Sequence, residues 1–438
     1  MPFVSAYGAS TPGWVFCGLA VLVITVAWRP HGLGPTVGAG VAVGIAAIGG
    51  AVELRDIGIA LESQWRAFLT LASVMAMTSA AERMGLLERL AAIIEPRTRG
   101  PVRHAFRVTF VLSAGVSTIL SNDAAILLMT PTVLVLLRTV YPRRHPKFMV
   151  PFAVAVFASA GVAPLVISNP MNLIFAEHAG IGFNEYSSRM MPIAIAGWIT
   201  AYCVLARMFR AELADPAPAL GQWPGAAPPL SRAALFIFAT VVAVLCAYPV
   251  LSYLDAPLWP GAAIGAVLCV GVSIAAGHPA RGVASGIAWT IFPFLISVFV
   301  LAVALQRIGV AAWLTNIYDS TRHPLATIAT VSALGSAVLN NHPMSVLNAF
   351  AIDLSPHTLL GNAEQPDTAT HTRIFAALIG GDLGPRLLPM GSIASLLWYD
   401  QLRRHGVVVR VSMFVRVGVW LTVPTLTVSL AVLWLLSR

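Results

Sequence analysis

The sequence predicts an all-α membrane protein that crosses a bilayer about ten times and is built from two related halves. Hydrophobic residues make up 58% of the 438 residues and charged residues only 10%, whereas soluble chains carry about 25% charged residues. Apolar runs of roughly 20 residues, the length that crosses a hydrocarbon core, recur along the chain. A polar interruption inside an apolar stretch also recurs half a chain later. This recurrence predicts two re-entrant helical hairpins, each accompanied by a broken helix.

The first interruption lies in the stretch Ser117–Pro131, where Asn122 and Asp123 interrupt a mostly apolar segment. A carboxylate at bilayer depth costs at least ~2.5 kcal/mol, so such a residue is tolerated where it faces a water-filled or protein-lined site. The alternative is a surface turn that carries Asp123. The return of the pattern later in the chain argues against that alternative.

The second interruption lies in Ser336–Phe350. Asn341 follows Asn122 by 219 residues, which is half of the chain length, and His342 stands where Asp123 stands in the first copy. Two halves with polar breaks at corresponding positions are typical of secondary transporters.

Residues 1–211 form the first predicted repeat. Residues 83–95 have the amphipathic spacing of an interfacial helix or of an extension of the preceding span. Basic clusters flank residues 105–137, and the positive-inside rule places both clusters in the cytoplasm. That segment is therefore a re-entrant hairpin or two full spans with almost no turn, and its polar centre favours the hairpin. The three spans that open this repeat are Gly13–Trp28, Leu33–Val52 and Trp65–Ala81.

A broken crossing follows, interrupted at Ser168-Asn169-Pro170-Met171-Asn172. Pro170 removes a backbone donor and disfavours a helical conformation at Asn169. The amides of Asn169 and Asn172 then become available as ligands. The alternative is a loop that follows a complete span. After one more span, the Pro- and Ala-rich residues 212–231 form a predicted cytoplasmic linker between the halves.

Residues 232–438 form the second predicted repeat, with its hairpin at 325–352 and Asn340 at the tip. The loop 353–371 carries Asp and Glu but no Arg or Lys, which indicates an external position. A second broken crossing contains Asp382 and Arg386, which either pair or each face the cavity. Five crossings and one hairpin in each half force the halves into opposite orientations, so the repeat is inverted. The remaining spans are Leu235–Leu251, Trp259–Ala276, Ile287–Leu305 and Ser412–Leu436.

The charged residues, the cysteines and the tryptophans are also typical of a polytopic membrane protein. The net charge of +9 lies mostly on Arg in short loops, so it indicates membrane orientation and no nucleic-acid partner. No cleavable signal peptide is recognisable. The four cysteines lack metal-ligand spacing, and neither a metal, a cofactor nor a disulfide framework is expected. Five tryptophans fall near predicted span ends, as interfacial tryptophans do: Trp28, Trp65, Trp259, Trp398 and Trp434.

Three blocks of the chain resemble the arsenite/antimonite permease family of the ion-transporter superfamily. They are Asn122–Pro131, the segment from Asn169 to Tyr186, and above all Asp382-Leu383-Gly384-Pro385 with the Pro389–Trp398 run. The resemblance implies the superfamily fold in the inner (plasma) membrane and efflux of arsenite or antimonite in exchange for protons. In that family a soluble ATPase subunit joins the permease in some cells. Dicarboxylate carriers of the superfamily show Ser-Asn-Thr at both tips, which this chain lacks.

The expected site suits a small uncharged trihydroxide, because amides and hydroxyls both donate and accept hydrogen bonds. A neutral guest is pumped outward only when its movement is coupled, and the proton carrier must titrate. Asp123 is the first candidate, followed by His342 and Asp382. A sodium/proton antiporter is the closest alternative; a passive channel and a membrane enzyme are others, although no enzyme motif is present. The expected guest-binding residues are Ser121, Asn122, Asn169, Asn172, Asn340, Asn341, Gly391 and Ser392.

Overall fold

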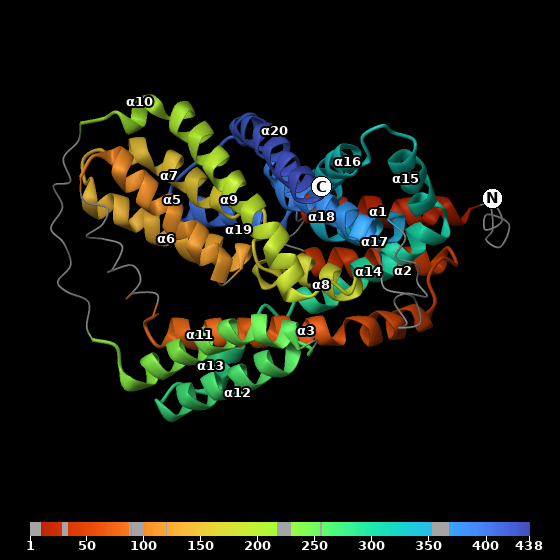
Figure 1. Ribbon diagram of the computed structural model, residues 1–438, viewed down its shortest axis with the longest axis horizontal. Coiled ribbons are helices and arrows are strands. Elements are labelled where there is room, and N and C mark those ends of the chain that lie inside the picture. Colours follow the sequence, from red (N-terminus) through yellow and green to blue (C-terminus); the bar gives the residue numbers. More distant parts are fainter. Residues whose placement is uncertain are drawn as a thin grey trace.

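A computed structural model describes residues 10–28, 34–86, 89, 100–119, 121–216, 229–254, 256–352 and 368–438. Every regular element in these ranges is a helix (Figure 1). The first half contains α1 (Thr11–Trp28), α2 (Pro35–Ile48), α3 (Leu54–Arg83), α5 (Val102–Ile119), α6 (Asn122–Val140), α7 (His145–Ser159), η4 (Val166–Ser168), α8 (Pro170–His178), α9 (Phe183–Met208) and α10 (Arg210–Leu213). The second half contains α11 (Arg232–Tyr253), α12 (Trp259–Ala275), α13 (Ala280–Ser285), α14 (Ile291–Arg307), α15 (Val310–Asp319), α16 (Pro324–Leu339), α17 (Asn341–Ala351), α18 (Thr368–Leu383), η6 (Gly384–Arg386), η7 (Pro389–Gly391), α19 (Ile393–Arg404) and α20 (Val411–Leu436).

Several helices have the length and composition of membrane spans. Of the described helices, α9, α11 and α20 are each long and apolar enough to cross a bilayer, and α14 with α15 do so as one pair bent by 73°. Other apolar helices, including α1, α2, α12 and α16, are shorter. This all-helical architecture confirms the predicted polytopic fold class. The predicted interfacial helix 83–95, the linker 212–231 and the loop 353–371 lie largely outside the described residues.

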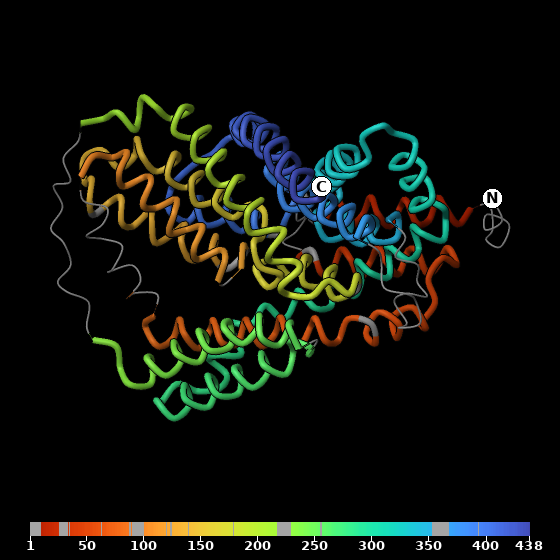
Figure 2. The backbone as a smooth tube through the Cα atoms, viewed as in Figure 1, coloured from red at the N-terminus to blue at the C-terminus, as the bar shows by residue number. Residues whose placement is uncertain are grey.

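The two predicted hairpins are helix pairs that break at the predicted residues. In the first, α5 ends at Ile119 and α6 begins at Asn122; in the second, α16 ends at Leu339 and α17 begins at Asn341. Each hairpin is followed by a broken helix: α7, η4 and α8 after the first, and α18, η6, η7 and α19 after the second. The element order therefore repeats along the chain, as Figure 2 allows the reader to follow.

Each hairpin packs against the broken helix of its own half and against the helix that follows the break in the other half. The first hairpin contacts α7, and its α6 also contacts α19 from the second half. The second hairpin contacts α18, and its α17 also contacts α8 from the first half. Helices α3, α11, α12 and α13 lie together along one side of the molecule (Figure 1). The two halves are thus interleaved at the breaks.

The expectation that Trp398 lies at a membrane interface was wrong. Its side chain is fully buried, its indole Nε1 donates to the carbonyl oxygen of Ala153 at 3.1 Å, and its ring lies 5.1 Å from that of Phe157. The reason is that α19 packs against α6 and α7, which enclose this face. Trp65 and Trp434 are exposed, as expected of interfacial residues.

Candidate functional site

The first break separates α7 from α8 and is organised by Asn169. Pro170 occupies the first turn of α8, where its missing N–H costs nothing. The Asn169 side-chain oxygen accepts a hydrogen bond from the Met171 amide at 3.1 Å and so caps α8. This cap fixes which end of the Asn169 amide faces the helix. Its Nδ2 atom points the other way, towards the second break.

The second break separates α18 from α19 and depends on close backbone approaches. A Cβ at Gly384 would lie 2.2 Å from the Ala333 carbonyl oxygen, and one at Gly391 would lie 2.6 Å from the Pro385 Cα. Ser392 caps α19 by accepting from the Ser395 amide at 3.0 Å. Gly391 and Ser392, both expected to bind the guest, therefore shape and cap the break in this structure.

Asp382 is a buried carboxylate at which the two breaks meet. The residue is 7% exposed. Oδ1 accepts from Asn169 Nδ2 at 2.6 Å, while Oδ2 accepts from the Ala163 amide and from Asn172 Nδ2, each at 2.9 Å. All three donors belong to the first break, and Ala163 stands 219 residues before Asp382. Hydrogen bonds to a carboxylate favour its ionised form, whereas burial disfavours it.

Tyr186 on α9 closes this arrangement into a ring of hydrogen bonds. Its hydroxyl accepts from Asn172 Nδ2 at 2.6 Å and donates to the Ala163 carbonyl oxygen at 3.1 Å. The side chain is fully buried, and a buried tyrosine hydroxyl usually finds a partner. We call Asp382, Asn169, Asn172, Tyr186 and the Ala163 backbone the carboxylate ring. The sequence predicted its carboxylate and both amides as site residues, but it did not predict Tyr186 or Ala163.

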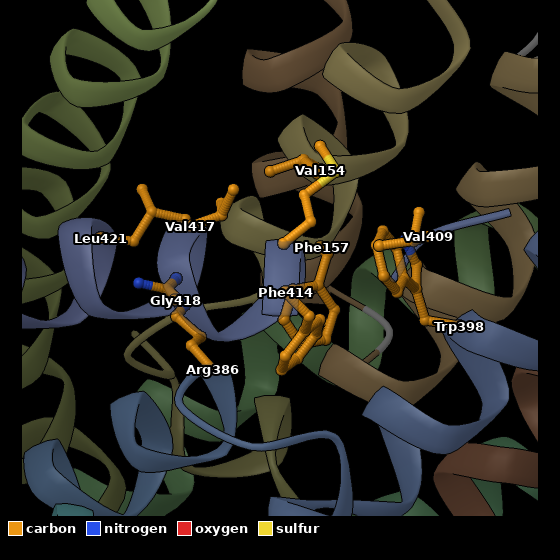
Figure 3. A pocket seen from close by; sticks show the side chains of 10 residues that line it. Val154, Phe157, Arg386, Trp398, Val409, Phe414, Val417, Gly418 and Leu421 are labelled. Carbon is orange, nitrogen blue, oxygen red and sulfur yellow. The ribbon is translucent and has the colours of Figure 1, made fainter. Parts of the chain in front are cut away.

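Arg386 lies four residues beyond Asp382, but the two do not form a direct ion pair in the described part of the chain. Arg386 is 3% exposed as a residue, its guanidinium donates to the Ala158 carbonyl oxygen, and its Nε has no hydrogen-bond partner among described residues. The side chain borders an apolar cavity of about 10 Å³, the lower limit for one water molecule. Figure 3 shows Phe157 and Phe414 between Arg386 and Trp398 in this cavity. Arg386 therefore supplies a buried positive charge near the carboxylate ring.

The tip of the first hairpin is tied to the first break through Asn122. Its Oδ1 accepts from the Ser117 hydroxyl, and its Nδ2 donates to the Gly161 carbonyl oxygen at 3.1 Å. The Ser121 carbonyl oxygen accepts from the Ala125 amide at 2.8 Å, in the first turn of α6. The Asp123 side chain lies outside the described atoms, so its expected role stays a prediction.

The tip of the second hairpin is strained and tied to the second break. Asn340 has φ 84° and ψ 149°, a region that costs a non-glycine residue about 1–3 kcal/mol. Its Nδ2 donates to the Met390 carbonyl oxygen at 3.3 Å, and its Oδ1 accepts from the His342 amide at 3.3 Å. Asn341 and His342 are both buried in the first turn of α17, and the His342 ring meets Phe294 edge-on at 5.7 Å.

Six of the expected residues lie in two groups, while Asn122 lies at the first tip and Gly391 and Ser392 lie at the second break. Asp382, Asn169 and Asn172 lie in the carboxylate ring, and Asn340, Asn341 and His342 lie together at the second tip. No direct hydrogen bond joins the groups among the described residues. No group of three or more His, Cys, Asp and Glu in the described ranges could hold a metal ion. Of the cysteines, Cys269 is buried and the others are exposed.

Comparisons with known proteins identify the family. A family model described as arsenical pump membrane protein matches residues 14–436. An arsenical pump membrane protein of Escherichia coli is 30% identical over 430 residues, which cover 96% of this chain and 97% of that protein. A putative arsenical pump membrane protein of Bacillus subtilis is 27% identical over 408 residues, with 88% and 90% coverage. The solved YdaH transporter of Alcanivorax borkumensis shares the fold, with a TM-score of 0.51, 14% identity and 84% of each chain covered. The chain therefore belongs to the arsenical pump membrane protein family.

Proposed function

We propose that this protein exports arsenite or antimonite across the inner membrane in exchange for protons, with Asp382 as the described residue that carries the proton. Membership of the arsenical pump family supports the substrate class. The observation that supports proton coupling is the carboxylate ring, in which the buried carboxylate of Asp382 connects both breaks. An intramembrane carboxylate with named partners is a functional site by default.

The hydrogen bonds at Asp382 suggest how exchange works. A carboxylate offers about four lone-pair positions, and the ring uses one on Oδ1 and two on Oδ2. One position on Oδ1 is left for a further donor, as far as the described residues show. Arsenite near neutral pH is an uncharged trihydroxide, so its O–H group and a proton compete for this position. Mutually exclusive binding of guest and proton is the condition for exchange.

The energetic demand on the coupling is modest. A proton that moves down a membrane potential releases about 2.3 kcal/mol per 100 mV, and each tenfold gradient of a neutral solute costs about 1.4 kcal/mol. One proton per guest therefore sustains a gradient of about fiftyfold at 100 mV. The proposed cycle needs no nucleotide, and a soluble ATPase subunit would add to this drive.

The interleaved packing supports an alternating cycle built on an inverted repeat. We place residues 1–211 and 232–438 in opposite orientations, with the hairpins entering from opposite faces. The hairpin helix α6 contacts α19, and α17 contacts α8, so one helix of each hairpin packs against the other half. Movement of one half against the other then exposes the carboxylate ring to one side at a time.

The test uses everted vesicles that are washed free of ATP and soluble proteins. Uptake of arsenite and of antimonite is measured with and without an imposed pH gradient and with an uncoupler. We expect gradient-driven uptake by the unaltered protein, its collapse by the uncoupler, and loss of gradient-driven uptake in Asp382→Asn. Asp319→Asn, the same change at an exposed carboxylate on α15, is the matched control and should retain uptake.

Three results would contradict the proposal. Sodium-dependent pH changes without oxyanion uptake would indicate the sodium/proton antiporter instead. Uptake that persists with an uncoupler would indicate a passive channel. Full gradient-driven uptake in Asp382→Asn would remove Asp382 from the coupling role and return attention to Asp123.

A further inference from the structure

His342 lies at the second hairpin tip with one ring nitrogen unused. The residue is 3% exposed and belongs to the first turn of α17. Its Nδ1 lies 2.7 Å from Asn341 Oδ1 and 3.2 Å from Asn340 Oδ1. Its Nε2 is buried and has no hydrogen-bond partner in the described part of the chain. The two nitrogens therefore have different roles, which depend on where the ring proton sits.

The surroundings of Asn340 decide the tautomer of His342. The Asn340 Nδ2 donates to the Met390 carbonyl oxygen, and its Oδ1 accepts from the His342 backbone amide. These two contacts fix the Asn340 amide so that an oxygen faces the imidazole. Because Nδ1 lies near amide oxygens, it must carry the proton and donate. In the neutral ring, Nε2 then presents a lone pair, which makes it a hydrogen-bond acceptor.

This acceptor is costly in the state that the structure shows. A buried polar atom that lacks a partner forfeits its hydration without replacement. The edge-on Phe294 ring lies on α14 at 5.7 Å and offers no strong donor. Asn340 holds a strained backbone conformation next to it. Strained backbone and unsatisfied polar atoms are features of sites that await a ligand.

We infer that His342 Nε2 accepts a hydrogen bond from a hydroxyl group of the transported guest. This inference rests on the proposed function, and it makes His342 a guest-binding residue and not the proton carrier. An uncharged metalloid trihydroxide supplies the O–H donor that the imidazole lacks. A sodium ion has no proton to donate and would prefer the neighbouring amide oxygens. The second tip is thereby selective for a hydroxylated neutral guest.

Two variants separate the nitrogens. In His342→Asn, the shorter amide can donate as Nδ1 does but has no atom at the Nε2 position. In His342→Gln, the longer side chain can place an oxygen acceptor near that position but loses the Nδ1 donor. Arsenite uptake into everted vesicles is measured over a range of arsenite concentrations and of pH for the unaltered protein and both variants.

We expect KM for arsenite to rise about tenfold in His342→Asn, with the maximal rate, gradient dependence and pH profile retained. In His342→Gln, KM should stay within about threefold of the unaltered value. An unchanged KM in His342→Asn would overturn the inference, as would equal rises in both variants. Loss of gradient dependence with KM retained would instead identify His342 as the proton carrier.

Two further readouts keep the outcome decisive. If His342→Asn fails to accumulate in the membrane, His342→Leu replaces it as the variant without a distal acceptor. Arsenite-induced thermal stabilisation of the purified protein measures binding without transport, and it should weaken in the Asn or Leu variant but not in Gln. If the unaltered protein takes up no arsenite, the proposed function itself fails; if it does and KM is insensitive to residue 342, only this inference fails.

Discussion

Replacement of Gly161 by alanine tests whether the buried guanidinium of Arg386 is tightly confined. A Cβ on residue 161 would lie 2.5 Å from Arg386 Nη2, closer than any ordinary contact. The Arg386 backbone cannot retreat, because its carbonyl oxygen already lies where a Cβ on Gly418 would be, at 1.7 Å. The guanidinium must therefore turn away and lose its hydrogen bond to the Ala158 carbonyl oxygen.

The expected loss of stability follows from that hydrogen bond. A hydrogen bond to a charged group contributes about 1.5–3 kcal/mol. Alanine also restricts the unfolded chain, which returns about 0.4–1 kcal/mol where the native backbone tolerates it. The net destabilisation of Gly161→Ala is then about 1–2 kcal/mol. A backbone shift at residue 161 would also reach the first hairpin tip, because the carbonyl oxygen of this residue accepts from Asn122.

Thermal inactivation of the detergent-solubilised protein, together with vesicle uptake, measures the effect. Gly115→Ala is the matched control, since Gly115 lies on an exposed face of α5 and a Cβ there meets nothing within 4 Å. That control should be neutral or slightly stabilising, because alanine favours helix over glycine. Equal stability and uptake of Gly161→Ala and Gly115→Ala would refute the close packing of Arg386 against the first break.

Two other substitutions probe the ring and the scaffold. Tyr186→Phe removes the hydroxyl that joins Asn172 to the Ala163 backbone, so we expect a loss of about 1–3 kcal/mol and slower arsenite uptake; unchanged uptake and melting temperature would show that the hydroxyl is dispensable. Asp56→Ala removes the partner of Arg307, whose guanidinium contacts the Asp56 carboxylate at 2.6 and 2.7 Å, and breaking such a pair costs about 3 kcal/mol. A melting temperature within one degree of the unaltered protein, on the order of a few tenths of a kcal/mol, would contradict that estimate.

The sequence predicted the breaks because polar residues in a long apolar run have few tolerable explanations. Asn122 and Asn341 begin α6 and α17 as expected, and Asn169 caps α8, the second part of a broken helix. Asp382 was the third candidate for the proton carrier, and the structure places it among three donors. Because a charged or polar group in lipid has a high free-energy cost, its presence in an apolar run indicates a functional position. It does not indicate which residues contact that group.

Most of the groups that contact these polar residues could not be predicted from the sequence. Ala163 contributes only its backbone N–H and C=O, which are free because the segment is not helical. Its side chain gives no sign of this role in the sequence. Tyr186 lies 14 residues beyond Asn172, and its contact with Asn172 depends on how α9 packs after the break. Trp398 resembled an interfacial residue by its place in the chain, and the packing of α19 buries it. Tertiary packing decides each of these cases.

The contact between α17 and α8 gives the two groups of polar residues a physical route to influence each other. His342 lies in the first turn of α17, whereas Asn169 and Asn172 hold Asp382 from the cap and first turn of α8. If the guest moves α17 when it binds, it therefore also moves α8, which supplies two hydrogen-bond donors to Asp382. A proton on Asp382 weakens its hydrogen bonds from Asn169 and Asn172. Because coupling between two binding sites is reciprocal, this protonation must also change the affinity for the guest at the second tip. The packed helices α17 and α8 therefore give guest and proton a second link, in addition to their direct competition at Asp382.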